Sequence, residues 1–211
     1  MEILNNFVVF EGLDGSGTTT QLNKLEDSYR KGNRLSLPPI YITYEPTNSS
    51  IGKLIRSALS KEIVFRPETI AMLFAADRNE HIFGADGVAE RCKRGELVVS
   101  DRYLLSSLVY QGITCGEELP SRLNRDFPVP ELLLFFDIEC ETALKRMEKR
   151  TKKEIYEYKD FQIQVRERYK ALLPRLSAEG VKVGIIDASL PAEEVALEVW
   201  SAIKKMPIFE R

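Results

Sequence analysis

Short runs of hydrophobic residues recur along the chain and alternate with longer stretches whose hydrophobic positions follow a helical spacing. The runs are rich in β-branched residues and occupy residues 7–11, 40–44, 97–101, 132–137 and 181–187. Each run is continuously hydrophobic instead of alternating, which is typical of strands buried on both faces of a parallel sheet. The pattern therefore predicts an α/β fold with five buried strands, and such folds bind ligands at the carboxyl ends of their strands.

The helices expected between these strands have recognisable limits. Gly32 ends the first of them, and Pro67 suits the first turn of another. Pro174 lies near the end of a long charged segment, where it should kink or end the helix. The predicted helices cover about residues 18–31, 51–61, 67–83 and 157–178, and a last segment that starts near Pro191 and includes Trp200.

Composition excludes several classes of protein. The 211 residues include 30 Lys+Arg and 32 Asp+Glu, a net charge of −2 that argues against a dedicated nucleic-acid binder. The longest hydrophobic run near the N-terminus, residues 7–10, is too short for a membrane span or a secretory signal. The only histidine, His81, makes a Ser-His-Asp relay or a His-rich metal site unexpected. We expect one domain over residues 1–211, located in the cytoplasm and in contact with neither nucleic acid nor membrane.

The three cysteines also argue against a zinc site and against a secreted protein. Cys92, Cys115 and Cys140 lie far apart, without the spacing of a zinc site or of a secreted disulfide framework. We expect them to be free thiols without a role.

A glycine-rich segment, EGLDGSGTTT at residues 11–20, follows the first predicted strand and opens the first predicted helix. Gly12 and Gly17 fit the phosphate-binding loop pattern G-x-x-x-x-G-K-[ST], and Thr19 fits its Mg²⁺-binding hydroxyl, but Thr18 stands where the lysine belongs. The position between strand and helix favours a phosphate-binding loop, and a tight turn is the alternative. Lys24 cannot replace the missing lysine, because six residues of helix turn it by about 240° away from the loop.

Two further segments carry chemistry. Phe74 and Arg78 lie four residues apart in LFAADR (residues 73–78) and share a helix face, which alone favours a core Phe and a surface Arg. The segment DRYLLSSLVYQG (residues 101–112) begins where a strand ends. There, Asp101 could hold Mg²⁺ through water, and Arg102 could bind an anion.

In combination, these segments resemble the thymidylate kinase family. The motifs appear in the family's order as FEGLDG (10–15), EP (45–46), IR (55–56), FAADR (74–78), the 101–112 segment and VRERY (165–169). The resemblance extends from about residue 7 to residue 203. It implies a P-loop three-layer α/β sandwich, a five-stranded parallel sheet flanked by helices with a short helical lid, and transfer of the ATP γ-phosphoryl group to dTMP.

The resemblance assigns one group of residues to dTMP. Phe74 would stack on thymine, while Arg78 and Gln111 would hydrogen-bond its polar edge. Such a site rejects a wrong base because buried polar groups would be left unpaired. The other residues implied are Asp14 beside the 3′-OH, Arg56 and Arg102 on the phosphate with Glu45 close by, Ser107 on the thymine side, and Tyr110 near the sugar.

A second group is assigned to ATP and Mg²⁺. The resemblance implies Thr19 and, in the outer shell, Asp101 for the metal. Catalysis would be positioning and electrostatics, without a general base, because the attacking phosphate oxygen is already anionic. The residues implied for ATP are Gly12, Gly15, Ser16, Gly17, Thr18, Thr19, Arg146 and Asp187, and those implied for catalysis are Asp14, Arg102, Arg150 and Lys153.

The chain departs from the family at three positions. Thr18 replaces the P-loop lysine, Tyr44 stands where many bacterial members have arginine, and Ile155 replaces the lid arginine. Loss of one preorganised charge typically costs about 10²–10³ in rate. We hypothesise that a lid over about residues 146–158 supplies the missing charge, through Arg146, Arg150 and Lys152 or Lys153.

Two other functions stay open at this point: a nucleotide-binding homologue that keeps the dTMP pocket but is catalytically impaired, and a kinase for another pyrimidine monophosphate. The family also implies a homodimer. We expect His81 to lie on a helix surface or domain edge, and Trp200 to pack the last helix on the sheet.

Overall fold

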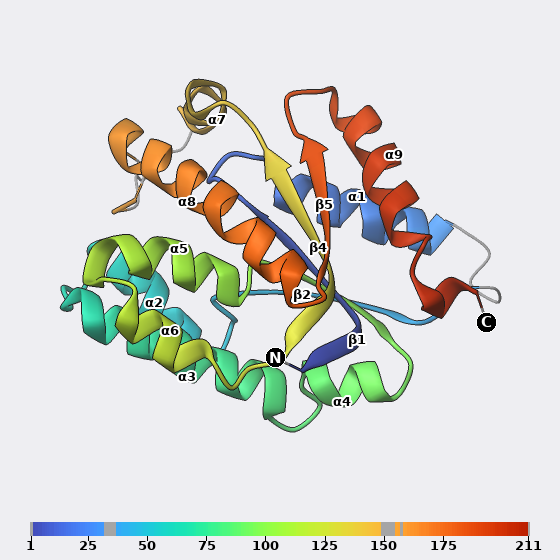
Figure 1. Cartoon of the computed structure of the whole chain (residues 1–211), viewed down its shortest axis with the longest axis horizontal. Coiled ribbons are helices and arrows are strands. Elements are labelled where there is room, and N and C mark those ends of the chain that lie inside the picture. The colour runs from blue at the N-terminus through green and yellow to red at the C-terminus, as the bar shows by residue number, and fades with distance from the viewer. Residues whose placement is uncertain (1, 32–36, 149–154, 157, 211) are drawn as a thin grey trace.

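The computed structural model describes residues 2–31, 37–148, 155, 156 and 158–210. A five-stranded sheet, parallel throughout, forms its centre in the order β2-β3-β1-β4-β5 (Figure 1). The strands are β1 (Ile3–Gly12), β2 (Ile40–Tyr44), β3 (Leu97–Asp101), β4 (Val129–Asp137) and β5 (Lys182–Asp187). The predicted α/β fold is confirmed.

The strands differ from the prediction at their ends and at one edge. β1 and β4 begin earlier than the hydrophobic runs, because Ile3 of β1 already pairs with Val129 of β4. The register of this pairing then shifts between Leu4 and Val8. The expectation that β5 is buried on both faces is wrong, since Ile185 is 67% exposed. β5 is an edge strand, with a neighbour on one side only.

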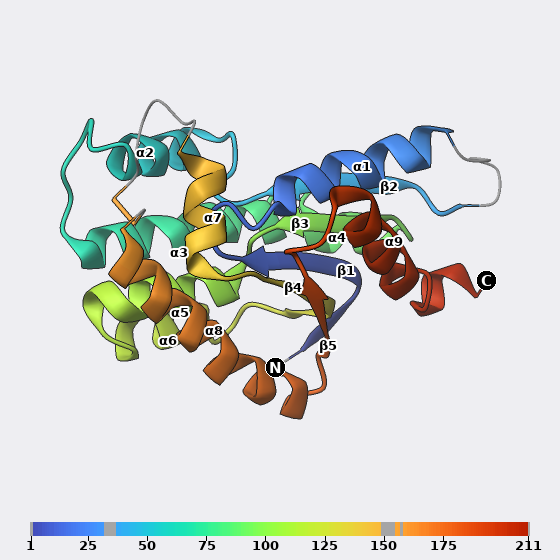
Figure 2. The ribbon, with the colours of Figure 1, turned by 90° about the horizontal axis from the view of Figure 1, so that it is seen from above.

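Helices cover both faces of the sheet. Figure 2 shows α1 (Thr18–Lys31) and α9 (Ala192–Ile203) together on one side. On the other side lie α5 (Leu104–Cys115), α6 (Glu118–Asn124) and α8 (Lys159–Ala178). The remaining helices are α2 (Ser50–Leu59), α3 (Pro67–Phe83), α4 (Val88–Lys93), α7 (Cys140–Met147) and the 3₁₀ turn η1 (Pro207–Phe209).

The bounds of α1 and α3 agree with the predicted ones, whereas α4 to α7 were not predicted. Pro174 does not end α8, which continues to Ala178. Its ring is exposed and lies in the last turns, so the missing N–H disturbs little of the helix.

Trp200 contacts other helices, and the expectation that it also packs α9 on the sheet stays a prediction. Its ring lies edge-on to Tyr29 of α1, at 5.7 Å between centroids, and to Phe209 of η1 at 5.9 Å. The reason is that α9 lies beside α1 and turns this side chain toward it. The three cysteines form no disulfide, and none of the described helices is long and apolar enough to cross a membrane.

The carboxyl ends of the strands meet at one edge of the sheet. Phe10 of β1 is in register with Asp101 of β3, and Gly12 with Phe136 of β4. The glycine-rich loop after β1 and the segment after β3 are therefore neighbours, although about 90 residues separate them in the chain.

Candidate active site

The glycine-rich loop connects β1 to the first turn of α1 and packs tightly against α7. Gly15 and Gly17 have positive φ angles of 83° and 96°, which favour glycine. A Cβ atom on Gly15 would lie 2.5 Å from the carbonyl oxygen of Ala143 in α7. The loop therefore needs glycine here both for its turn and for the close approach of α7.

A cavity of about 500 Å³ opens over this loop, and we call it the P-loop cavity. Thr18, where a lysine was expected, is buried at its base, and Lys24 pairs instead with Glu193 of α9. Among the described residues, the cations that line the P-loop cavity are Arg102 and Arg146. Arg146 stands over the loop, with Nη1 4.0 Å from the position of a Cβ on Gly17.

Two oxygen ligands face each other between β3 and α1. The Thr19 hydroxyl donates to Asp101 Oδ2 at 2.7 Å, while Asp101 Oδ1 is buried and has no hydrogen-bond partner among the residues that the structure describes. Within the described ranges, no group of three or more His, Cys, Asp or Glu residues could hold a metal ion. A hydroxyl beside an unsatisfied carboxylate fits a Mg²⁺ that keeps most of its waters and is held mainly by substrate phosphates.

A second cavity, of about 810 Å³, lies between β2, α3 and α5, and we call it the α3 cavity. Asp14, Thr19, Asp101 and Arg102 line both cavities. Its other lining residues include Tyr44, Glu45, Arg56, Phe74, Arg78, Ser107, Tyr110, Gln111 and Tyr156. All the residues that the resemblance assigned to dTMP therefore lie together around one space.

Arg78 lines this cavity, and only 1% of its surface is exposed. Its Nε and Nη2 donate to Glu45 Oε2 at 3.0 and 2.7 Å, Nη2 donates to Ser107 at 3.1 Å, and Nη1 donates to Asn124. The guanidinium also lies 5.3 Å from the ring centroid of Tyr103. The interpretation of Arg78 as a surface residue, favoured by its segment alone, is wrong.

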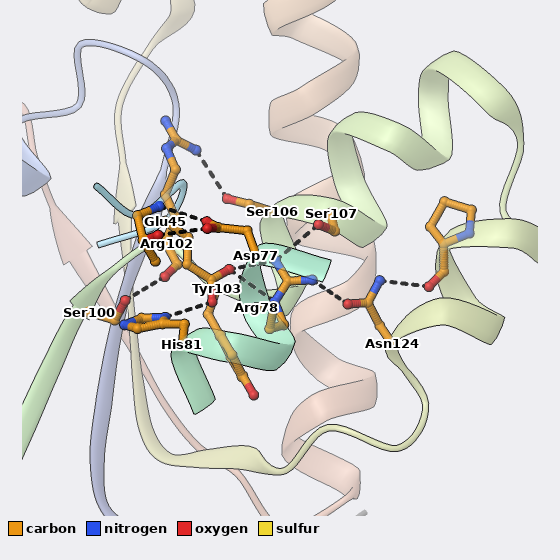
Figure 3. Close-up of polar contacts among 12 residues, drawn as sticks. Glu45, Asp77, Arg78, His81, Ser100, Arg102, Tyr103, Ser106, Ser107 and Asn124 are labelled. Atoms are coloured by element: carbon orange, nitrogen blue, oxygen red, sulfur yellow. Dashed lines mark hydrogen bonds and ion pairs between the residues drawn. The ribbon is translucent and has the colours of Figure 1, made fainter. Parts of the chain in front are cut away.

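His81 also joins this network, so its expected place on a helix surface is wrong. Its side chain is 7% exposed. Nδ1 lies 3.0 Å from Glu45 Oε1, and Nε2 lies 2.7 Å from the Thr43 hydroxyl. Arg78 and His81 are three residues apart on α3, which turns both toward Glu45 (Figure 3).

Arg56 of α2 is held by a loop that sequence reasoning did not identify. Its guanidinium donates to the carbonyls of Pro46 and Thr47, and to the Asn48 side chain at 2.8 Å. Asp77, also missed, is buried at 1% exposure and pins this loop. It accepts from the Thr47 N–H at 2.7 Å, from the Thr47 hydroxyl at 2.6 Å and from Ser49 at 2.7 Å.

Arg102 stands at the junction of the two cavities. Its φ angle is 70°, and Nη2 donates to Asp14 Oδ1 at 2.6 Å. Nη1 donates to Ser106 at 3.1 Å and lies 3.4 Å from the Tyr169 hydroxyl. Burial alone would lower the pKa of Arg102, but the neighbouring Tyr110 and Asp14 hold it well above the usual value.

Behind Arg102, Glu11 is completely buried and accepts four hydrogen bonds. The donors are the N–H groups of Tyr103 and Ser106, the Ser106 hydroxyl and the Tyr169 hydroxyl. Burial, and then the Glu11 carboxylate, raise the pKa of Tyr169 well above its ordinary value. Tyr169 therefore stays protonated and remains a donor, which ties α8 to the strand end that carries the loop.

The remaining predicted residues are placed less centrally. The Asp187 side chain accepts from the backbone and hydroxyl of Ser189, and the neighbouring Ala188 lines the P-loop cavity. Arg150, Lys152 and Lys153 lie outside the described residues, as does most of the expected lid. The Ile155 N–H donates to the Leu59 carbonyl of α2 at 3.2 Å. Tyr156, which sequence reasoning missed, stacks on Phe161 and closes one side of the α3 cavity.

Comparisons with known proteins agree on one family. Residues 10–199 match the family model described as "Thymidylate kinase". A Pyrobaculum aerophilum protein named "Probable thymidylate kinase" is 38% identical over 205 residues, which covers 97% of this chain and 99% of the relative. A protein of that name from Methanocaldococcus jannaschii is 38% identical over 96% of this chain and 98% of the relative. A Treponema pallidum relative, also named as a thymidylate kinase, is 42% identical over 82% of this chain and 81% of its own length.

The hydrogen bonds around Glu11 generate a stability prediction. Tyr169→Phe removes one donor from a buried carboxylate, so it should lower the free energy of unfolding by about 1–2 kcal/mol in urea titrations. Tyr158→Phe is the matched control at the start of the same helix, where the ring is 56% exposed. It should change the unfolding free energy by less than about 0.5 kcal/mol. Equal effects of the two substitutions would contradict the prediction.

Proposed function

The chain belongs to the thymidylate kinase family, and we propose that its two cavities hold dTMP and ATP side by side for direct phosphoryl transfer. The observation that carries the proposal is the junction: Asp14, Thr19, Asp101 and Arg102 line both cavities. A phosphate acceptor in the α3 cavity and a phosphate donor in the P-loop cavity would meet there. Holding two reactants in line is most of what this reaction requires.

We assign the base to the inner end of the α3 cavity. Phe74 offers a ring for stacking, and Arg78 offers an N–H group for a carbonyl oxygen. Gln111 is 2% exposed, and its buried Oε1 has no hydrogen-bond partner within the described part of the chain. An acceptor beside a donor matches N3–H and O4 of thymine, whereas cytosine presents the opposite pattern on those two atoms.

We assign the dTMP phosphate to Arg56 and Arg102, with the sugar between Asp14 and Tyr110. Arg102 is fixed by Asp14 and Ser106, so its charge is preorganised at the place where the two substrates meet. On the donor side, the backbone of Gly15 to Thr19 would cradle the ATP phosphates. Mg²⁺ would be held by Thr19 and, through water, by Asp101, and it would neutralise charge on the phosphates.

One prediction concerns the choice of base. With ATP and Mg²⁺, the chain should phosphorylate dTMP, and its kcat/KM for dCMP should be lower by at least about 10³, because cytosine leaves buried donors and acceptors unpaired. The loss for dUMP, which lacks one methyl group, should be about 10–200-fold. Absence of ADP formation with dTMP would support the impaired homologue, and equal turnover of the three nucleotides would refute thymine specificity.

Substitution of the base pocket refines this assay. Gln111→Leu should lower kcat/KM for dTMP by at least about 10², since a buried polar contact to the base is lost. Gln164→Leu is the matched control, because Gln164 is an exposed residue of α8. It should leave kcat/KM within about twofold of the unsubstituted chain. A similar loss in both variants would contradict the assignment of Gln111.

The missing P-loop lysine makes the source of positive charge a separate question. We propose that Arg146 takes over part of its role, supported by the place of its guanidinium over Gly17. The P-loop packs on α7, the helix that carries Arg146. Arg150 and Lys153 remain proposed partners in this role, within the proposed lid of residues 146–158.

The role of Arg146 can be tested by substitution. Arg146→Ala should lower kcat/KM for ATP by about 10²–10³, the usual effect of losing one preorganised charge stabiliser. Lys24→Ala is the control, because Lys24 is paired with Glu193 away from the loop, and it should have little effect. The proposal is refuted if Arg146→Ala, Arg150→Ala and Lys153→Ala all leave turnover unchanged while Thr18→Lys raises it at least about tenfold.

We propose that the chain is a homodimer that associates through α3. Met72, Ala76, Asn79 and Phe83 are exposed at spacings of four, three and four residues, so they form one stripe along this helix. Met72 is 51% and Phe83 is 55% exposed, which is unusual for two large apolar side chains on one stripe. A cytoplasmic location is supported by three cysteines that form no disulfide.

A charge substitution tests this surface. Met72→Glu places a charge on the apolar stripe, so it should convert the dimer to a monomer in size-exclusion chromatography with light scattering. Val64→Glu is the control, since Val64 is 88% exposed outside the stripe, and it should remain dimeric. A monomeric unsubstituted chain, or a dimeric Met72→Glu variant, would overturn the proposal.

A further inference from the structure

The side chain of His81 lies between the edge of the sheet and α3. Both of its ring nitrogens have partners: Nδ1 lies 3.0 Å from Glu45 Oε1 (Figure 3), and Nε2 lies 2.7 Å from the Thr43 hydroxyl. Its side chain is 7% exposed and the Glu45 side chain 2%. Thr43 belongs to β2 and His81 to α3, so the imidazole joins the edge of the sheet to the helix that carries Phe74 and Arg78.

The hydrogen-bond partners fix which nitrogen carries a proton. Glu45 Oε2 accepts two N–H groups of Arg78, and a buried carboxylate paired with an arginine is ionised. An ionised carboxylate only accepts hydrogen bonds, so Nδ1 of His81 must be the donor. Nε2 then accepts from the Thr43 hydroxyl when the ring is neutral, and donates to it when the ring is charged.

A count of the N–H donors of Arg78 shows what Glu45 controls. A guanidinium has five N–H groups. Glu45 takes two, and Ser107 and Asn124 take one each. Among the described residues, one N–H on Nη1 has no partner and is available to a ligand in the α3 cavity. Its direction depends on how the Glu45 carboxylate is oriented.

We propose that His81 is a positioning residue for base recognition. By holding Glu45 Oε1, it fixes the plane of the carboxylate, and the carboxylate fixes the Arg78 guanidinium so that its remaining N–H faces the base. Without the imidazole, a buried carboxylate oxygen loses its described partner and the carboxylate can rotate. The inference rests on the proposed function, because it takes Arg78 as the contact to thymine.

The kinetic test compares three variants of the full chain. His81→Leu should raise KM for dTMP by about 10–100-fold, the size expected for losing a hydrogen bond to a charged group, while kcat and KM for ATP stay within about threefold. His81→Gln should return KM for dTMP to within about threefold of the unsubstituted value, because its amide has an NH₂ group that can donate to Glu45 and a carbonyl oxygen that can accept from Thr43. Glu80→Leu, at the adjacent exposed position, should have no effect.

Each outcome decides the proposal. It is overturned if His81→Leu leaves KM for dTMP unchanged, if KM for both substrates and kcat change together, or if His81→Gln is as impaired as His81→Leu. Absence of dTMP phosphorylation by the unsubstituted chain would instead overturn the proposed function.

A spectroscopic measurement on the unsubstituted protein keeps the test independent of any folding defect. Because His81 is the only histidine, its ring nitrogens give the only imidazole signals in ¹⁵N NMR spectra. We expect a protonated Nδ1 in the absence of ligand, and a change in the ring signals when dTMP is added. A tautomer protonated on Nε2 alone, or signals that dTMP does not change, would overturn the proposal.

Discussion

The arrangement of the α3 cavity depends on one buried ion pair. Glu45 and Arg78 have side chains that are 2% and 1% exposed, so neither charge is stabilised by bulk water. Removing two charges from water is favourable only if their mutual geometry is good and the remaining donors and acceptors are satisfied. Here the partners come from four different elements: Thr43 of β2 through His81 of α3, Ser107 of α5 and Asn124 of α6. A polar network that must be complete therefore sets how these helices stand against the edge of the sheet.

This constraint reaches the other end of the cavity through neighbouring residues of α3. Asp77 precedes Arg78 and pins the loop that follows Glu45, and the carbonyls of that loop hold Arg56. The parts of the cavity lined by Arg78 and by Arg56 are thus fixed by one turn of one helix. At the junction, Arg102 is set in a similar way by Asp14, and Tyr169 ties α8 to the same place.

The sequence was sufficient for features with local signals, and insufficient for those made by long-range contacts. Continuous hydrophobic runs located all five strands, and the glycine spacing located the loop. Burial of Ile185 was predicted wrongly, because a continuous hydrophobic run in the sequence does not show which strand lies at the edge of the sheet. His81, Asp77 and Asn124 were missed or misplaced because each is defined by a partner at least 28 residues away in the chain. The position of a polar residue in a helix sequence does not show whether its side chain is buried or exposed, because this depends on the partner that it contacts in the fold.

The distribution of charge within the site explains why the overall balance near zero is compatible with two phosphate-bearing substrates. Among the described residues, Glu45 neutralises Arg78, and Asp14 pairs with Arg102. Arg56 is held by neutral carbonyl groups and lines the α3 cavity, so its charge remains available to an anion. Arg146 is placed in a comparable way over the P-loop cavity. Each cavity thus keeps one cation without a carboxylate partner among the described contacts. With Thr18 in place of a lysine, the P-loop cavity offers an anion the backbone N–H groups of its loop and the Arg146 guanidinium. The electrostatic demand of this kinase therefore falls on geometry more than on the number of charges.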